Sequence, residues 1–202
     1  LPKQSKPTKH HAALAYAGVP GFVMRLRATN SGLIAKLAFE FLILTVSRTS
    51  EVLLAKKAEI DLSQNLWTVP AERMKAKKQH RVPLSERAVA ILDEAEEYND
   101  ESEFIFPSDK PDRPLSNMIF LKMIERMKLD ITAHGFRSSF RDWASETTSY
   151  PSEVAEMALA HTIEKKVEAA YRRGDLLEKR RPMMEAWARY ALGKQGQMDN
   201  QN

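Results

Sequence analysis

The stretch GLIAKLAFEFLILTVSRTSEV, residues 32–52, sets a nearly continuous apolar run directly before an arginine. Apolar residues over positions 32–46 are dense enough to predict a helix that is buried on most of its faces. Arg48 follows this helix, where a charged guanidinium is costly unless it pairs with an anion. Glu51, three residues further on, can hold it in place, and a short helix is predicted over residues 49–57. The stretch therefore predicts a helical core with a cation at its edge.

The rest of the chain predicts further helices around one small sheet. The segments LWTVP (66–70) and HRVPLS (80–85) are rich in β-branched and aromatic residues and flank the basic stretch AERMKAKKQ, which predicts an antiparallel pair with a basic loop. FIFPS (104–108) is a candidate edge strand. Helices are predicted over residues 10–30, 85–98 with Ser85 as N-cap, 116–128, 133–147, 152–161, 164–173 and 175–192. The predicted class is α+β, predominantly helical, with a small antiparallel β-sheet.

Composition indicates one domain and a general cellular setting. Of the 202 residues, 1–9 form a predicted basic linker, 10–192 the domain and 193–202 a disordered tail. The net charge of +4 permits a polyanionic partner without requiring one. The absence of cysteine excludes disulfides and thiol nucleophiles and favours a reducing compartment. Because no apolar run approaches the roughly 20 residues of a membrane span, the sequence predicts a cytoplasmic protein without a membrane partner.

Motifs for metal-driven or ATP-driven chemistry do not occur in the sequence. It contains no GxxxxGK[ST] loop, no HExxH, no GxSxG and no carboxylates spaced for two metals. The acidic run EAEEYNDESE has no histidines nearby and is interpreted as a solvated helix end. We therefore expect no cofactor and no metal.

Five further residues could carry chemistry. His134 and Arg137, in ITAHGFRSSFRDW (131–143), lie three apart and so share one helix face. Lys75 lies near the tip of the predicted hairpin, His161 ends a predicted helix, and Tyr171 follows ten residues later, directly before two arginines. Each alone has a structural interpretation: a surface pair, a solvated lysine, a histidine that caps a helix dipole, or a core tyrosine.

Together with Arg48, these residues can grip a phosphodiester and move protons around it. Cations neutralise the non-bridging oxygens, and a proton donor assists the leaving oxygen. A tyrosine hydroxyl, with an ordinary pKa near 10, needs neighbouring cations and a base to become a nucleophile. The set supplies both.

The order of Arg48, Lys75, HGFR, LAH and tyrosine resembles the catalytic domain of the tyrosine recombinases, the phage integrase family, over residues 10–192. Phrases such as LWTVPAERMKAKKQHRVPLS and KVEAAYRRGDLLEKRRPMMEAWARY are similar to integrases of prophages and genomic islands. The resemblance implies the fold of the DNA breaking-rejoining enzymes. It also implies site-specific DNA recombination, the integration or excision of a prophage or genomic island.

The resemblance implies a role for each residue at the phosphate. Arg48 and Arg137 would clamp the scissile phosphate, Glu51 would act as the acidic accessory residue, and His161 would hydrogen-bond the phosphate. Tyr171 would attack, leaving a 3′-phosphotyrosine bond and a free 5′ hydroxyl.

The proton transfers would fall to two other residues. Lys75 would protonate the departing 5′ oxygen, and counting back from the VPL of the next strand selects it over Lys77 or Lys78. His134 would accept or return the tyrosine's proton.

Two departures from the family pattern stand out. Ala160 and the pair Thr49-Ser50 occupy positions where members often carry glycine. The amino-terminal DNA-binding domains usual in the family are also expected to lie outside this chain.

The expected partner is double-stranded DNA at attachment sites in a bacterial host, with nucleoid association. Phosphate contacts are predicted from the basic residues Arg73, Lys77, Lys78 and Arg81. The family implies a tetramer on DNA, whereas the isolated domain is expected to be a monomer. The final helix, 175–192, could pack on a neighbouring protomer, but packing on its own domain is favoured.

Two alternative functions stay open from the sequence. A type IB topoisomerase-like enzyme would relax DNA without exchanging strands. A non-catalytic DNA-binding regulator would keep the fold alone, although it would have no reason to retain a nucleophile among its cations.

Overall fold

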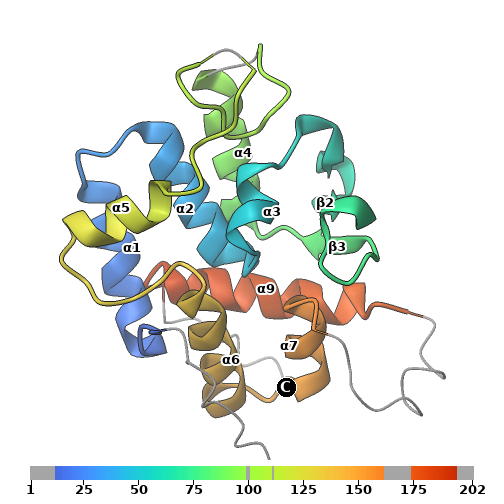
Figure 1. Cartoon of the computed structure of the whole chain (residues 1–202). Coiled ribbons are helices and arrows are strands. Elements are labelled where there is room, and N and C mark those ends of the chain that lie inside the picture. Colours follow the sequence, from blue (N-terminus) through green and yellow to red (C-terminus); the bar gives the residue numbers. More distant parts are fainter. Residues whose placement is uncertain (1–11, 99–100, 111, 162–173, 195–202) are drawn as a thin grey trace, which may run out of the picture.

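The computed structural model of the chain describes residues 12–98, 101–110, 112–161 and 174–194 (Figure 1). Its elements in chain order are η1 (Tyr16–Gly18), α1 (Val19–Ala28), α2 (Leu33–Thr45), α3 (Thr49–Leu53), η2 (Lys57–Glu59), β1 (Ile60–Asp61), η3 (Leu62–Gln64), β2 (Leu66–Val69), η4 (Ala71–Arg73), β3 (His80–Pro83), α4 (Glu86–Tyr98), α5 (Ile119–Arg126), α6 (Gly135–Thr147), α7 (Ser152–Ala158) and α9 (Leu177–Ala191). The predicted class, mainly helical with a small antiparallel sheet, is confirmed.

Helix α2 is the buried helix that the apolar run predicts. Every residue from Leu37 to Thr45 is buried, including the carboxylate of Glu40, which is 2% exposed. Glu40 pairs with Arg27 at 2.5 Å and with Arg87 at 2.8 Å. Burial alone would raise the pKa of Glu40, but the hydrogen bonds from these two arginines outweigh it and lower the pKa. A charge can therefore stay inside the core because two cations neutralise it.

The sheet contains the predicted hairpin and one strand more. Strands β2 and β3 are antiparallel, with Trp67 opposite Val82 and Val69 opposite His80, and the two-residue β1 pairs with β2. The edge strand predicted at 104–108 is wrong: Phe104 makes one isolated bridge to Lys56, and Pro107 another to Pro114. A proline cannot donate to a ladder, which limits strand pairing at this segment.

Several helices are shorter than predicted. The helix predicted over 10–30 begins at Val19, with Pro20 in its first turn, and η1 precedes it. The helix predicted over 49–57 ends at Leu53. Ser85 is confirmed as the start of α4, since its Oγ accepts the amide hydrogen bond of Ala88 at 3.3 Å. The helix predicted over 164–173 lies outside the described residues.

Helix α9 packs on its own domain. Figure 1 shows it in red between the group formed by α2 and the sheet and the pair formed by α6 and α7, and it contacts α1, α2, α7 and β3. The indole Nε1 of Trp187 donates to the carbonyl of Ile43 in α2 at 2.8 Å, and its ring centroid lies 5.1 Å from that of Trp143 in α6. The last described helix thus closes the core. Within the described ranges, no helix is long and apolar enough to cross a membrane.

We expect Trp187→Ala to lower the free energy of unfolding of the chain by about 3–5 kcal/mol, because it removes a fully buried ring and leaves a cavity. Urea unfolding followed by circular dichroism measures this change. Tyr98→Ala is the control, since Tyr98 is 59% exposed and should change stability little. Equal midpoints for the two variants would contradict packing of α9 within its own domain.

Candidate active site

The turn after α2 fixes the position of Arg48. Val46 ends α2 in the left-handed region, with φ 49° and ψ 28°, which is uncommon for a β-branched residue. Two residues later, Arg48 is the N-cap of α3. The carboxylate of Glu51 accepts from the Arg48 backbone N–H at 2.8 Å and from its guanidinium Nη1 at 2.7 Å. The predicted pairing of Arg48 with Glu51 is therefore present, and the buried carboxylate orients the partly exposed arginine.

Arg137, in α6, is held in a different way. Arg137 is only 5% exposed. Its Nη1 donates to the carbonyl of Val46, and its Nη2 donates to the carbonyl of Leu159 at 2.6 Å. Among the described residues, no carboxylate lies within ion-pair distance of this guanidinium. Burial, and then the charge of Arg48, lowers the pKa of Arg137 to about 10, so the group is still a cation near neutral pH.

A buried cation without a directly bonded anion is expensive. Carbonyls at the ends of two helices accept hydrogen bonds from the terminal nitrogens of Arg137 and offset part of this cost. Arg48 adds to the cost, because its like charge is close enough to lower the pKa of Arg137. Such an arrangement is suited to an anionic ligand, which would restore the missing counter-charge. This pair of arginines is the basis of the candidate site.

The end of α7 presents His161 to Arg137. The amide of His161 donates to the carbonyl of Glu156 at 3.0 Å, and the amide of Ala160 donates to that of Met157 at 3.1 Å. This is the Schellman pattern, in which the residue after the C-cap takes a left-handed conformation and glycine is preferred. Ala160 occupies that position with φ 49°. The conformation explains why glycine suits this position and why alanine is a strained but workable substitute.

The ring of His161 lies between a carboxylate and the buried arginine. Its Nδ1 is 2.7 Å from Glu156 Oε2, and its Nε2 is 3.3 Å from Arg137 Nη2. Because a guanidinium can only donate, this geometry places the proton of the neutral ring on Nδ1, directed at Glu156. Sequence analysis missed Glu156, since its five-residue separation from His161 spans the helix end and is not a same-face spacing.

His134 is the N-cap residue of α6 and is exposed. Its backbone carbonyl accepts from the Arg137 amide at 3.1 Å, so the first turn of α6 links the two predicted site residues. Gly135 is required between them, because a Cβ there would lie 2.5 Å from the carbonyl oxygen of Ala12. The HGFR motif therefore combines two polar residues with a close backbone contact.

Lys75 is exposed in the loop between β2 and β3. The adjacent Met74 is 3% exposed and anchors the loop in the core. Arg73 donates from Nη1 to the backbone carbonyl of Glu51 at 2.9 Å and pairs with Glu59 through Nη2. The loop that carries Lys75 is thereby tied to the helix that carries Glu51.

The four predicted DNA contacts have different surroundings. Lys77 and Lys78 are exposed, and Lys77 adopts a left-handed turn conformation with φ 51°. Arg73 is 17% exposed and paired with Glu59, and Arg81 is paired with Asp175 at 2.6 Å. A DNA role for the two arginines stays a prediction, and it would require their guanidinium groups to serve protein and DNA together.

Tyr171, the predicted nucleophile, lies outside the described residues. Its relation to the arginines therefore stays a prediction.

His80, the first residue of β3, is a neighbour of the site that sequence analysis did not single out. Burial, followed by the charges of Arg180 and Arg137, lowers its pKa from 6.5 to about 4, against the opposing effects of Glu51 and of a hydrogen bond with the backbone of Ala158. His80 is thus neutral at physiological pH, among residues of α3, α6, α7 and α9. No local spacing connects these positions, so only the fold reveals this neighbour.

The fold is a mainly helical domain, and the arginine pair is its candidate site for an anion. The phage integrase family matches residues 23–176, and the chain belongs to this family. It is 36% identical over 173 residues to prophage integrase IntA of Escherichia coli K12, and this alignment covers 84% of the chain and 42% of IntA. It is also 36% identical to prophage integrase IntZ of the same strain, over 89% of this chain and 44% of IntZ. The chain thus spans less than half the length of these relatives.

Solved structures support the same fold. The integrase of mycobacterium phage Brujita aligns with a TM-score of 0.65 at 18% identity, over 91% of this chain and 60% of that one. A lambda integrase tetramer bound to a Holliday junction aligns with a TM-score of 0.62 at 19% identity, over 82% of this chain and 51% of that one. The architecture expected from the resemblance is therefore confirmed.

The low pKa of His80 predicts a specific pH dependence of stability. Above pH 6.5 the residue is neutral in both folded and unfolded chains, whereas between pH 6.5 and 4 only the unfolded chain gains the proton. Folding should therefore lose up to about 3 kcal/mol from this residue as pH falls through that window. We expect His80→Gln to remove this part of the slope when unfolding free energies are measured from pH 4 to 7.5.

The comparison at pH 7.5 is the control, because it gives the cost of the substitution itself without any titration. If the free energies of unfolding of the wild type and His80→Gln differ by the same amount at every pH from 4 to 7.5, His80 is not held neutral in the folded chain and the prediction is wrong.

Proposed function

We propose that this domain cleaves and rejoins double-stranded DNA during site-specific recombination, through a 3′-phosphotyrosine intermediate and without metal or ATP. The observation that carries the proposal is the buried guanidinium of Arg137, which is fixed by two carbonyls beside Arg48 and has no bonded carboxylate among the described residues. A phosphodiester supplies the missing anion. Membership of the phage integrase family supports the same reaction.

Two arginines and a histidine would hold the scissile phosphate. Arg48, oriented by Glu51, and Arg137 would donate to the non-bridging oxygens and stabilise the extra charge of the pentacoordinate transition state. Because carbonyls and a carboxylate already fix these side chains, little reorganisation is needed when the phosphate arrives. In its doubly protonated form, His161 would donate a hydrogen bond from Nε2 to the phosphate in place of its contact with Arg137, while Glu156 accepts from Nδ1 and keeps the ring oriented.

The remaining residues would move protons. The hydroxyl oxygen of Tyr171 attacks phosphorus while His134 accepts its proton, and the bond from phosphorus to the 5′ oxygen breaks. Lys75 protonates that departing oxygen, which leaves a free 5′ hydroxyl and a 3′-phosphotyrosine bond. The reverse attack by another strand's 5′ hydroxyl restores the phosphodiester and frees the tyrosine. Bond energy is conserved, so no cofactor is consumed.

DNA contact would extend from this site over the β2–β3 loop. Lys77 and Lys78 are exposed beside Lys75 and are suited to phosphates rather than to bases. Binding by this chain should weaken steeply with salt, because phosphate contacts release counterions. The lambda integrase tetramer on a Holliday junction supports a tetramer on DNA here, with attachment sites as the substrate. Alone, the domain is expected to be a monomer.

The biological role that best fits is integration or excision of a prophage or genomic island in a bacterial cytoplasm, at the nucleoid. The similarity to prophage integrases IntA and IntZ supports this class. A topoisomerase-like enzyme would instead relax a plasmid that lacks the attachment site, and a non-catalytic regulator would bind DNA without cutting it. Neither alternative is favoured, because the family and the arginine pair both fit cleavage with strand exchange.

We expect this chain to form a covalent adduct with a duplex of a candidate attachment site nicked beside the exchange point, because the short cleaved strand diffuses away and prevents religation. Denaturing electrophoresis measures the adduct, and peptide mapping should place the DNA on Tyr171. The Tyr171→Phe variant should bind the duplex as tightly as the wild type and form no covalent adduct. Lys77→Gln should reduce DNA binding and its salt dependence while leaving the mapped residue unchanged.

An adduct that survives in Tyr171→Phe would contradict the proposed nucleophile. If this chain gives no adduct, the duplex is tested again with the amino-terminal DNA-binding domains usual in the family fused to the chain. Persistent absence of an adduct, with intact binding, would favour the regulator.

A further inference from the structure

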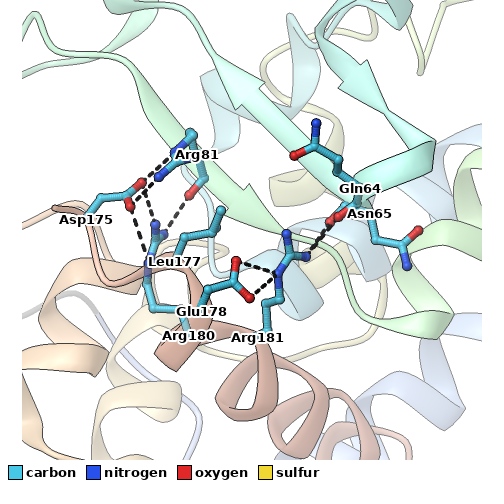
Figure 2. A network of polar contacts seen from close by, with 8 residues as sticks. All are labelled: Gln64, Asn65, Arg81, Asp175, Leu177, Glu178, Arg180 and Arg181. Atoms are coloured by element: carbon cyan, nitrogen blue, oxygen red, sulfur yellow. Dashed lines mark hydrogen bonds and ion pairs between the residues drawn. The ribbon is translucent and has the colours of Figure 1, made fainter.

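A three-residue ion cluster joins the start of α9 to strand β3 (Figure 2). Asp175 accepts two hydrogen bonds from the guanidinium of Arg81, one from Nε at 2.8 Å and one from Nη2 at 2.6 Å. Arg180, one turn into α9, approaches the same carboxylate at 3.0 Å. Bidentate contact of this kind restricts orientation as well as distance.

Arg180 makes this cluster unlike an ordinary surface ion pair. Its side chain is 0% exposed, and its Nη1 donates to the backbone carbonyl of Arg81 at 2.6 Å. Burial lowers the pKa of Arg180 to about 10, and Asp175 is the group that opposes this effect. Because the buried guanidinium of Arg180 contacts both strand β3 and Asp175, it fixes the position of Asp175 relative to the strand.

The cluster also sets the first turn of α9. Leu176 adopts a left-handed conformation with φ 55°, and the amide of Leu177 donates to Asp175 Oδ1 at 3.3 Å. The carboxylate thus satisfies backbone and side-chain donors at one point. The path of the chain is therefore fixed at Asp175, before the regular helix begins.

We propose that Asp175, Arg81 and Arg180 form a positioning clamp that fixes the chain four residues after the nucleophile. This inference rests on the proposed function, with Tyr171 as the attacking residue. Four residues span at most about 14 Å when fully extended, so fixing Asp175 limits the distance of the tyrosine's Cα from that of Asp175 to this value. On the other side of the tyrosine, His161 lies ten residues away and restricts it far less.

The fixed point stands beside the cation site. His80 precedes Arg81 in β3, and the charges of Arg180, Glu51 and Arg137 all act on its ring. Strand β3 therefore carries both Arg81 of the clamp and His80, the neighbour of the proposed phosphate site. Holding Asp175 against it keeps the tyrosine within reach of the phosphate, which is the kind of restriction that raises the rate of an intramolecular attack.

The test measures single-turnover cleavage of the nicked attachment-site duplex by the wild-type chain and by Asp175→Asn, Asp175→Glu and Arg81→Gln. Loss of the clamp should lower the cleavage rate, measured at saturating DNA, at least tenfold in Asp175→Asn and severalfold in Arg81→Gln. DNA binding should be unchanged in Asp175→Asn, and saturation removes any loss of a phosphate contact in Arg81→Gln. Asp175→Glu should recover part of the rate. The matched control is Glu178→Gln, since Glu178 pairs with Arg181 on the same helix, is 79% exposed and should leave the rate unchanged.

A second measurement separates positioning of the tyrosine from support of the arginines. In Tyr171→Phe, added hydrogen peroxide supplies a small nucleophile: hydroperoxide attacks the same phosphorus, the 5′ oxygen leaves and takes a proton, and a 3′-phosphoperoxy ester remains. This attack needs the cation site but no tethered tyrosine. The double variant Asp175→Asn, Tyr171→Phe should therefore cleave with peroxide at a rate within twofold of Tyr171→Phe alone. In chains that keep Tyr171, by contrast, Asp175→Asn should lower the rate of the tyrosine reaction.

Equal cleavage rates in the wild type, Asp175→Asn and Arg81→Gln would overturn the clamp and leave the proposed function intact. A parallel fall of the tyrosine and peroxide reactions would also overturn it, because the cluster would then support the whole site. Absence of a Tyr171-dependent adduct, both from the wild-type chain and from its fusion to amino-terminal DNA-binding domains, would instead overturn the proposed function. If Asp175→Asn fails to fold, Arg81→Gln decides the outcome, because it leaves the buried contact between Asp175 and Arg180 in place.

Discussion

The hydrogen bonds from Arg137 to two backbone carbonyls are the constraint on which the site depends. One carbonyl ends α2 and the other ends α7, and each helix end includes a non-glycine residue in a left-handed conformation, Val46 and Ala160. Strain at such positions persists only where the surrounding structure enforces it. The guanidinium of Arg137 has fixed carbonyl acceptors but no bonded carboxylate among the described residues. Its positive charge is therefore not neutralised by a direct ion pair there, which suits it to an anionic ligand.

Helix α9 connects this site to the stability of the domain. Trp187 and the aromatic cluster around it close the core at one end of the helix, while Arg180 and Asp175 tie its other end to β3. Packing of α9 is therefore coupled to strand β3, which also carries His80, the neighbour of the proposed phosphate site.

The sequence predicted the features that depend on local patterns. The buried α2, the β2–β3 hairpin, the Ser85 cap and the pairing of Arg48 with Glu51 all follow from periodicity, turn composition or near-neighbour charge. The features it missed depend on contacts that no helix or strand period connects: Glu156 beside His161 across a helix end, His80 among residues of α3, α6, α7 and α9, and Asp175 held by Arg81. The predicted edge strand failed because β propensity cannot show whether a partner strand is available.

Replacement of one non-bridging oxygen of the scissile phosphate by a methyl group tests the central claim most directly, because it removes the negative charge that Arg137 is proposed to neutralise. The cleavage rates of Arg137→Ala and of the wild type are compared on phosphate and methylphosphonate duplexes. We predict that Arg137→Ala loses cleavage of the phosphate and recovers a substantial part of it on the methylphosphonate. An equal loss on both duplexes would contradict the account, since Arg137 would then act by positioning or folding and not through its charge.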